Sequence, residues 1–214
     1  MRAFIVANSQ HSLPPVHLRP QAGDLVLAAD GGANLCLAWD WPVDAVVGDM
    51  DSIAAEARRQ LEGQGVPFMV APTAKDETDL ELALRLALSR GATDLVIAGA
   101  LGGRIDHTLG NLALLALPSL ASTPTRIADG DQTIWLVRDR LTIAGQPGDT
   151  LSLLPFGGDA RGVSVSGVHW PLHEAELPLG PSQSISNRMI ASQAEVVVRS
   201  GLLLAVHITA DPWR

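Results

Sequence analysis

The chain has 214 residues, 47% hydrophobic and 18% charged, a balance typical of a soluble globular protein with one large or two small domains. Its formal net charge of -8 argues against a nucleic-acid-binding surface, which needs an excess of lysine and arginine. The single cysteine, Cys36, leaves no internal disulfide and predicts a cytoplasmic location, and the short apolar run at 3–7 predicts neither signal peptide nor membrane span.

The first part of the chain, up to about Ser122, alternates short apolar runs with segments of helical length. Strands are predicted at residues 3–7, 25–29, 43–47, 68–70 and 95–98. Helices are predicted at residues 33–39, 54–64, 79–90 and 108–117. Such alternation is typical of βα units and predicts an α/β domain with a mostly parallel sheet.

The third predicted helix has the clearest pattern. Its apolar residues recur at helical spacing on one face, while Glu81 and Arg85 form an i,i+4 pair on the other. Thr78 with Glu81 three residues later is a capping box, and Gly91 is expected to end the helix. Asp79 is therefore expected in the first helical turn.

After Pro118 the pattern changes to short runs of β-branched and aliphatic residues separated by glycine-containing turns. Strands are predicted at residues 134–137, 141–143, 151–154, 163–165, 195–199 and 202–208. Since no convincing helix lies among them, we expect an all-β, sandwich-like domain. The predicted division is therefore an α/β catalytic domain at 1–125 and a β domain at 126–214.

Acidic residues follow the predicted strands of the first domain in four loops, at 29–34, 48–52, 75–79 and 102–107. The loops carry Asp30, Asp49, Asp51, Asp76, Asp79 and Asp106. Because parallel strands end at the same edge of a sheet, we expect these carboxylates to converge there. Mg²⁺ prefers oxygen ligands and is typically held by one or two protein carboxylates together with substrate phosphates, so this edge is a candidate metal site.

Each loop also allows a purely structural interpretation. Asp51 or Ser52 could cap the following helix. The glycines after Asp30 could form a tight turn, although glycines there also let main-chain N–H groups approach a phosphate. Asp76 and Asp79 could simply favour a helix N-terminus through the helix dipole.

The fourth loop is equally ambiguous when it is taken alone. Asp106 could be the N-cap of the helix expected to begin near Thr108, and His107 could be a surface histidine. Lys75 and Arg104 could be solvated charges, or could pair with carboxylates or phosphate oxygens. The shared sheet edge is what favours a common functional site.

Motifs of several other enzyme classes are absent from the sequence. The chain has no Gly-x-x-x-x-Gly-Lys-Ser/Thr phosphate loop and no Gly-x-Gly-x-x-Gly fingerprint, which argues against a phosphate-loop kinase and a dinucleotide oxidoreductase. It has no zinc-like Cys/His spacing and no Gly-x-Ser-x-Gly nucleophile motif.

Taken together and in order, these blocks resemble the signature blocks of the thiamine pyrophosphokinase (thiamine diphosphokinase) family. The blocks are 29–34, 48–52, 75–79, 102–107 with Asn111, and Ser186 with Asn187. The resemblance covers essentially the whole chain. It implies an α/β catalytic domain followed by a β-sandwich-like domain, a homodimer with thiamine at the subunit interface, and Mg²⁺-assisted transfer of a diphosphoryl group from ATP to thiamine, with AMP as the second product.

The resemblance also implies roles for single residues. The expected Mg²⁺ ligands are Asp49, Asp51 and Asp79. The expected catalytic group is Asp106, Arg104, Lys75 and Asp76, with Asp106 nearest the thiamine hydroxyl. The expected substrate contacts are Asp30, Gly31, Gly32, Asn34, Ser52, His107, Asn111, Ser186 and Asn187. The chain departs from the pattern at Arg188, where bacterial members commonly have glutamate, so the details of the thiamine pocket stay open.

Two other functions stay open from the residues themselves. Asp-x-Asp after a strand is also how nucleotide-sugar transferases hold a metal-bound diphosphate, and a thiamine- or nucleotide-binding regulator could keep the fold without catalysis. Thiamine is itself a flat cation, so an aromatic contact would suit it, and Trp170 and Trp213 are candidates, although tryptophan there is more often packing.

Overall fold

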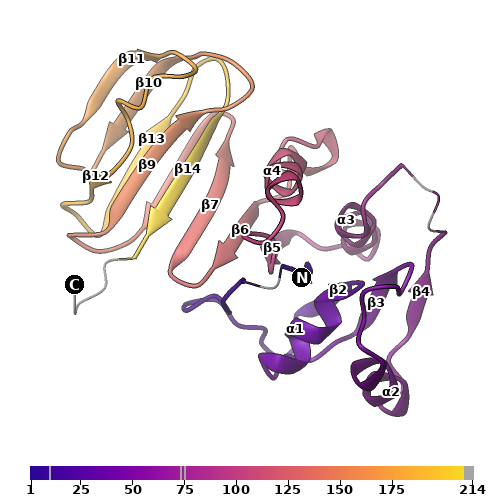
Figure 1. Ribbon diagram of the computed structural model, residues 1–214. Helices are drawn as coiled ribbons and strands as arrows, with labels where there is room; N and C mark the ends of the chain where they lie inside the picture. Colours follow the sequence, from indigo (N-terminus) through magenta and orange to yellow (C-terminus); the bar gives the residue numbers. More distant parts are fainter. Residues whose placement is uncertain (10, 73, 75, 210–214) are drawn as a thin grey trace. The chain divides into compact units, whose positions relative to one another are not determined.

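The computed structural model describes residues 1–214 except 10, 73, 75 and 210–214 (Figure 1). Lys75 and Trp213 therefore lie outside the described residues. The chain divides into two compact units, Met1–Gly130 and Asp131–Arg214. Among the helices of the described part, none combines the length and apolar character that a bilayer crossing requires.

The described part of the first unit contains a parallel sheet with the strand order β6-β5-β1-β2-β3-β4 (Figure 1). Its strands are β1 (Arg2–Val6), β2 (Leu25–Ala29), β3 (Ala45–Gly48), β4 (Phe68–Val70), β5 (Asp94–Ala98) and β6 (Thr125–Asp129). Every residue of β2 and β3 is buried, as expected for parallel strands covered on both faces. The prediction of an α/β domain with a mostly parallel sheet is confirmed.

Strand β6 was not predicted from the sequence. Its five residues include Arg126 and Asp129, and only Ile127 and Ala128 are buried, so it lacks a continuous apolar run. It is a strand because it pairs in parallel with β5. The first unit extends to Gly130, so β6 belongs to it.

The helices of this unit are α1 (Gly32–Ala38), α2 (Ala55–Gly63), α3 (Asp79–Ser89) and α4 (Ile105–Leu114), followed by a short 3-10 helix, η1 (Pro118–Leu120). Helix α3 packs on β1, β2 and β3 through the apolar face expected from the sequence. The Thr78 side chain accepts a hydrogen bond from the Glu81 N–H at 3.3 Å. Gly91, with φ +81°, follows the helix end, so the expected caps are present.

Helix α4 begins three residues earlier than predicted. Arg104 is its N-cap, with extended backbone at φ -70° and ψ 121°, and Asp106 lies in the first turn. Asp106 is therefore not the N-cap that one interpretation of the sequence allowed. The preceding Gly102 and Gly103 adopt positive φ angles of 85° and 68°, which turn the chain into the helix before Asp106 is reached.

The strand order reverses direction at β1. From β1 the chain adds β2, β3 and β4 on one side, then returns through α3 to place β5 and β6 on the other side. In open α/β sheets, ligands bind outside the carboxyl ends of the strands where the order reverses. The loops after β1 and β5 are therefore the expected centre of a site.

The second unit consists of antiparallel strands in two groups, ordered β12-β9-β14-β7 and β11-β10-β13-β8. The strands are β7 (Gln132–Val137), β8 (Arg140–Ala144), β9 (Thr150–Pro155), β10 (Ala160–Ser166), β11 (Leu172–Leu177), β12 (Asn187–Arg188), β13 (Gln193–Val197) and β14 (Leu203–Ile208). Residues of both groups, such as Leu151 of β9 and Val163 of β10, share one apolar core, so the predicted sandwich-like architecture is confirmed.

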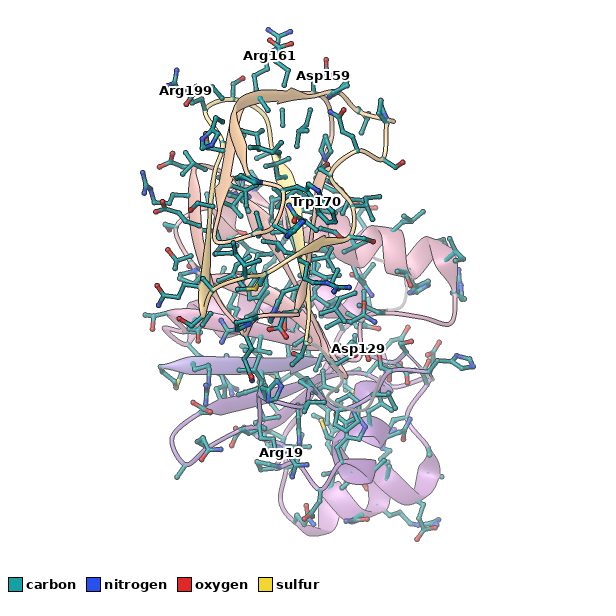
Figure 2. The ribbon with its side chains drawn as sticks, turned by 90° about the vertical axis from the view of Figure 1, so that its left-hand side faces the viewer. Arg19, Asp129, Asp159, Arg161, Trp170 and Arg199 are labelled. Atoms are coloured by element: carbon teal, nitrogen blue, oxygen red, sulfur yellow. The ribbon has the colours of Figure 1, made fainter. Side chains whose placement is uncertain are left out.

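Strands β11 and β12 were not predicted. The first carries His173, Glu174 and Glu176 among few apolar residues, and the second has only two residues. β11 is a strand because it pairs with the preceding strand β10, and β12 because it pairs with the more distant β9. At one end of this unit Asp159, Arg161 and Arg199 lie close together (Figure 2), where the Arg199 N–H donates to the Arg161 carbonyl at 3.1 Å.

Candidate active site

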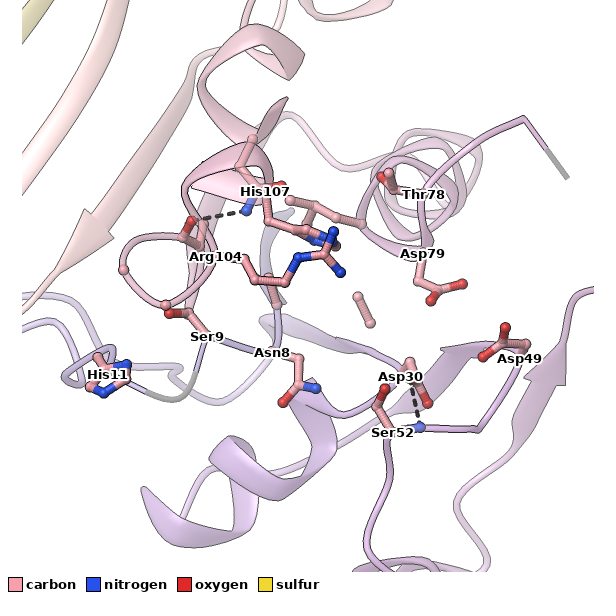
Figure 3. Close-up of a pocket in the computed structure, with 18 of the residues that line it drawn as sticks. Asn8, Ser9, His11, Asp30, Asp49, Ser52, Thr78, Asp79, Arg104 and His107 are labelled. Atoms are coloured by element: carbon pink, nitrogen blue, oxygen red, sulfur yellow. Dashed lines mark hydrogen bonds between the residues drawn. The ribbon is translucent and has the colours of Figure 1, made fainter. Parts of the chain in front are cut away.

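A pocket of about 670 Å³ lies at the carboxyl edge of the first unit's sheet (Figure 3). Its wall comes from the loops after β1, β2, β3 and β5 and from the beginnings of α3 and α4. It brings together seven residues that the sequence had suggested: Asp30, Asp49, Ser52, Asp79, Arg104, His107 and Asn111. The volume is typical of a site for a small molecule or nucleotide.

Three aspartates form a compact group in this pocket. Asp30 follows β2, Asp49 follows β3, and Asp79 is the first residue of α3. Each offers one carboxylate oxygen, and these oxygens all lie within 4.8 Å of one another. Carboxylates this close repel one another unless a cation or a proton lies among them.

Asp30 is the most buried member, with 5% of its surface exposed. Its Oδ2 atom accepts a hydrogen bond from the Ser52 N–H at 3.1 Å, whereas its Oδ1 atom has no hydrogen-bond partner among the described residues. Burial raises the pKa of Asp30, and the negative charge of Asp79 adds to that rise. An unpartnered, buried carboxylate oxygen beside two more carboxylates is a donor set that fits Mg²⁺.

Gly48 makes the approach of these carboxylates possible. A Cβ atom at this position would lie 2.8 Å from the Asp30 Cβ and 2.9 Å from the Asp79 Cγ. Its φ of +151° is also one that residues with side chains rarely adopt. Glycine is therefore required at the end of β3 for two independent reasons.

The structure does not bring Asp51 into this group. Its side chain is exposed and its Oδ1 atom accepts a hydrogen bond from the Ser52 hydroxyl at 2.7 Å. Among the described residues, neither Asp51 nor Asp76 lines the pocket, and Asp76 is exposed. Lys75 lies outside the described residues.

Three expected substrate contacts, Gly31, Gly32 and Asn34, are not among the residues that line the pocket, and two of them have a clear structural role. A Cβ at Gly32 would lie 1.9 Å from the Val6 carbonyl oxygen, so glycine lets α1 pack closely on β1. The Asn34 side chain donates to the Ser52 carbonyl at 3.1 Å and accepts from the Ala54 N–H at 3.0 Å. Asn34 thus holds the loop that carries Ser52.

Arg104 and Asp106 form a two-point ion pair, with Nη2 to Oδ2 at 2.5 Å and Nε to Oδ1 at 3.1 Å. Asp106 is exposed, and the hydrogen bonds from Arg104 lower its pKa to about 2. Figure 3 shows the Arg104 guanidinium between Asp79 on one side and Ser9 on the other. The pocket therefore has an acidic part and a part lined by Arg104 and His107.

Sequence reasoning missed the loop after β1, which contributes Asn8, Ser9 and His11 to the pocket. The Ser9 hydroxyl donates to the Leu101 carbonyl at 2.5 Å, which ties this loop to the loop after β5 where the strand order reverses. The available signal was a polar segment directly after a predicted strand. It was passed over because it carries no carboxylate.

Ser186 and Asn187 lie in the second unit. Ser186 has a φ of +62°, and its N–H donates to the Ser152 hydroxyl at 2.9 Å. Asn187 borders a second, smaller cavity of about 90 Å³ together with Trp170. Of the two predicted substrate contacts in this unit, Ser186 has an unusual backbone conformation and Asn187 lines a cavity.

Two family models match this chain, one in each of its two units. The family model "Thiamin pyrophosphokinase, catalytic domain" matches residues 18–127, and "Thiamin pyrophosphokinase, vitamin B1 binding domain" matches residues 140–203. A curated relative, thiamine pyrophosphokinase of Bacillus subtilis (strain 168), is 32% identical over 178 residues, covering 78% of this chain and 79% of the relative. Thiamine pyrophosphokinase 1 of Arabidopsis thaliana is 28% identical over 210 residues, covering 86% of this chain and 78% of the relative.

Solved structures agree with these matches. The crystal structure of thiamine pyrophosphokinase from Bacillus subtilis superposes with a TM-score of 0.88 at 28% identity, covering 99% of this chain and 100% of that one. A thiamin pyrophosphokinase family protein from Enterococcus faecalis superposes with a TM-score of 0.83 at 26% identity, covering 99% and 100%. The similarity therefore extends over both units.

Proposed function

The chain belongs to the thiamin pyrophosphokinase family, and we propose from this premise that it transfers a diphosphoryl group from ATP to the hydroxyl of thiamine, giving thiamine diphosphate and AMP. One observation carries the assignment of this chemistry to the first unit. Asp30, Asp49 and Asp79 meet opposite Arg104 in a single pocket, within the range that the catalytic-domain model matches. The nucleotide-sugar transferase and the non-catalytic regulator have no support among the matches.

We propose that Mg²⁺ is held by Asp49 and Asp79, the two residues common to the sequence-based ligand set and to the cluster. The unpartnered Oδ1 of Asp30 supports adding this residue as a third ligand. We propose that Asp51 lies outside the set of Mg²⁺ ligands, where its side chain accepts a hydrogen bond from the Ser52 hydroxyl. Bound there, Mg²⁺ supplies positive charge that offsets the charge of the triphosphate.

The protein's own residues position the reactants. The thiamine oxygen attacks the β-phosphorus of ATP, the bond from that phosphorus to the oxygen of AMP breaks, and AMP leaves with the electron pair. Arg104 and His107 line the pocket and are placed to donate hydrogen bonds to phosphate oxygens. Lys75 is proposed to do the same, and Asp76 to assist it, on the family resemblance alone.

Asp106 has a different role from a general base. With a pKa of about 2 it is a weak proton acceptor at neutral pH, because Arg104 stabilises its ionised form. We propose that it orients Arg104 and the thiamine hydroxyl. The hydroxyl proton is released late, as the bond to phosphorus forms, so a strong base is not needed.

Thiamine binding is proposed for the second unit, which the vitamin B1 binding model matches. We propose that Ser186 contacts thiamine, and that the protein is a homodimer with each thiamine site at the subunit interface. Gly31, Gly32, Asn34, Ser52 and Asn111 are proposed to shape the substrate site. A cytoplasmic location stays a prediction that rests on the cysteine content.

The function is tested by incubating the purified protein with ATP, Mg²⁺ and thiamine and identifying the products by mass spectrometry. We expect equimolar AMP and thiamine diphosphate. Formation of ADP would instead indicate transfer of a single phosphoryl group. Thiamine binding without AMP would support the regulator, and turnover of a nucleotide sugar would support the transferase.

A further inference from the structure

Asn187 uses its side-chain amide to hold the main chain of Trp170. Its Oδ1 atom accepts a hydrogen bond from the Trp170 N–H at 3.1 Å, and its Nδ2 atom donates to the Trp170 carbonyl at 2.7 Å. The same Oδ1 atom also accepts from the Arg188 N–H at 2.8 Å. Both lone pairs of the amide oxygen and one of its two amide hydrogens are therefore engaged by main-chain groups.

The segment that carries Asn187 is itself fixed to strand β9. The Ser184 hydroxyl donates to the Leu153 carbonyl at 2.6 Å, and the Ser186 N–H donates to the Ser152 hydroxyl at 2.9 Å. Ser152 is buried, with 7% of its surface exposed. Asn187 thus connects a segment that is anchored at two points to the turn between β10 and β11, on which Trp170 lies.

Trp170 is the large aromatic residue of this network, and its side chain is exposed. Its relative exposure is 61%, and Figure 2 shows it in the second unit. It lines the cavity of about 90 Å³ whose remaining wall is mostly apolar: Leu151, Leu153, Val165, Leu172 and Ile185. The His169 ring meets the indole edge to face, with ring centroids 4.6 Å apart, which restricts the indole further.

We propose that Asn187 is a positioning residue for thiamine, which acts through Trp170 and does not contact the substrate itself. The proposal rests on the proposed function and changes one assignment in it, because the family resemblance made Asn187 a direct contact. An indole carried on a main chain that Asn187 holds, beside an apolar cavity, suits a flat, cationic ring system, which gains both apolar contact and a cation–π interaction. The amide keeps that surface in place before thiamine arrives.

A double-mutant cycle with Asn187→Ala, Trp170→Ala and the double variant tests the proposal. We expect Asn187→Ala to raise the KM for thiamine about tenfold while leaving kcat and the KM for ATP within about twofold, because the loss concerns the thiamine surface alone. The KM of the double variant for thiamine should be no higher than that of Trp170→Ala, since the Asn187 amide then has no indole to position. If the two effects multiply, Asn187 contacts thiamine directly and the proposal is wrong.

Asn187→Asp is the conservative variant that separates positioning from direct contact. Aspartate keeps the acceptor for the two N–H groups but places a carboxylate opposite the Trp170 carbonyl, so we expect the KM for thiamine to rise nearly as much as in Asn187→Ala. A direct contact to the thiamine cation predicts an unchanged or lower KM. Should Asn187→Ala fail to fold, Asn187→Asp paired with Trp170→Phe completes the cycle.

The wild-type assay separates failure of this proposal from failure of the proposed function. If the wild-type protein forms no thiamine diphosphate, the function is wrong. If it does, and Asn187→Ala lowers only the melting temperature with every kinetic constant unchanged, the amide is a structural brace and the positioning role is excluded. Thiamine quenching of tryptophan fluorescence should be present in the wild type and reduced in Trp170→Phe.

Discussion

Asp30 accepts a hydrogen bond from the Ser52 N–H through Oδ2 at 3.1 Å and leaves its buried Oδ1 atom without a partner among the described residues. An ionised carboxylate in this position destabilises the metal-free protein, since burial and the charge of Asp79 raise its pKa. The residue is better explained by what it binds than by what it contributes to folding.

Asp30→Asn should therefore stabilise the protein and impair its activity. We expect the unfolding free energy in EDTA at pH 7 to rise by about 1 kcal/mol, a typical gain when an unfavourable functional residue is relieved. The folded state holds its proton more tightly than the unfolded state, so this difference is present at neutral pH and disappears as pH falls through the raised pKa towards 3.8. Denaturant unfolding at several pH values measures it, and a variant less stable than wild type at pH 7 would contradict the explanation.

Asp49 and Asp79 should separate clearly from Asp51 in Mg²⁺ binding. Asp49→Asn and Asp79→Asn are expected to weaken Mg²⁺ binding more than about 100-fold, the upper end for changes around a metal ligand, and Asp51→Asn about tenfold or less. Calorimetric Mg²⁺ titration in the presence of an unreactive ATP analogue measures this. Equal losses in Asp49→Asn and Asp51→Asn would restore the ligand set inferred from the family resemblance.

Gly48→Ala should disrupt the acidic cluster without unfolding the sheet. The added Cβ would approach both Asp30 and Asp79, and the φ of +151° strains any residue other than glycine. We expect turnover to fall by at least about 100-fold, as displacement of positioned groups typically costs. Gly63→Ala is the matched control, because Gly63 ends helix α2 and a Cβ there meets nothing within 4 Å.

Removing the Arg104 guanidinium should change the titration of Asp106. The pKa of Asp106 is about 2 beside Arg104, and in Arg104→Ala we expect it to rise towards its usual 3.8. Carboxyl carbon chemical shifts measured against pH report this directly. A carboxyl whose folded pKa is lowered contributes stability that is present above pH 3.8 and is lost as pH falls to about 2, so any stability advantage of the wild type over Arg104→Ala should disappear over that pH range.

The loss of catalysis in Arg104→Ala should be larger than a change in ionisation explains. A donor aimed at charge that develops on a phosphate oxygen is typically worth about 100- to 1000-fold in kcat. Arg104→Lys retains the charge without the two-point geometry and should recover only part of this. Wild-type kcat in Arg104→Ala would remove the residue from the catalytic group.

Mixing two inactive variants tests the proposed dimer. Asp49→Asn removes the first unit's site and Ser186→Ala the second unit's contact. If each thiamine site combines the first unit of one protomer with the second unit of its partner, random mixing should recover about a quarter of wild-type activity, because half the dimers are mixed and each has one intact site. No recovery after unfolding and refolding the mixture together would place the site within one protomer.

The sequence alone predicted most of the first unit because its signals are local. Within the described residues, apolar runs alternating with helical periodicity located five strands and four α-helices of this unit, and the caps of α3 follow from Thr78 and Gly91. Carboxylates after several parallel strands also predicted the convergence of Asp30, Asp49 and Asp79. Strands β6, β11 and β12 were missed because pairing with another strand, and not their own composition, makes them strands.

What only the tertiary structure decided is which oxygen faces which neighbour. Asp49 and Asp51 are equivalent in a sequence pattern, yet the turn directs Asp49 towards Asp79 and Asp51 towards Ser52. Asn187 carries an amide suited to a ligand, yet that amide holds the main chain of Trp170. Residue type and order determine the chemistry available, whereas direction depends on backbone angles and on contacts between segments far apart in the chain, which no local pattern encodes.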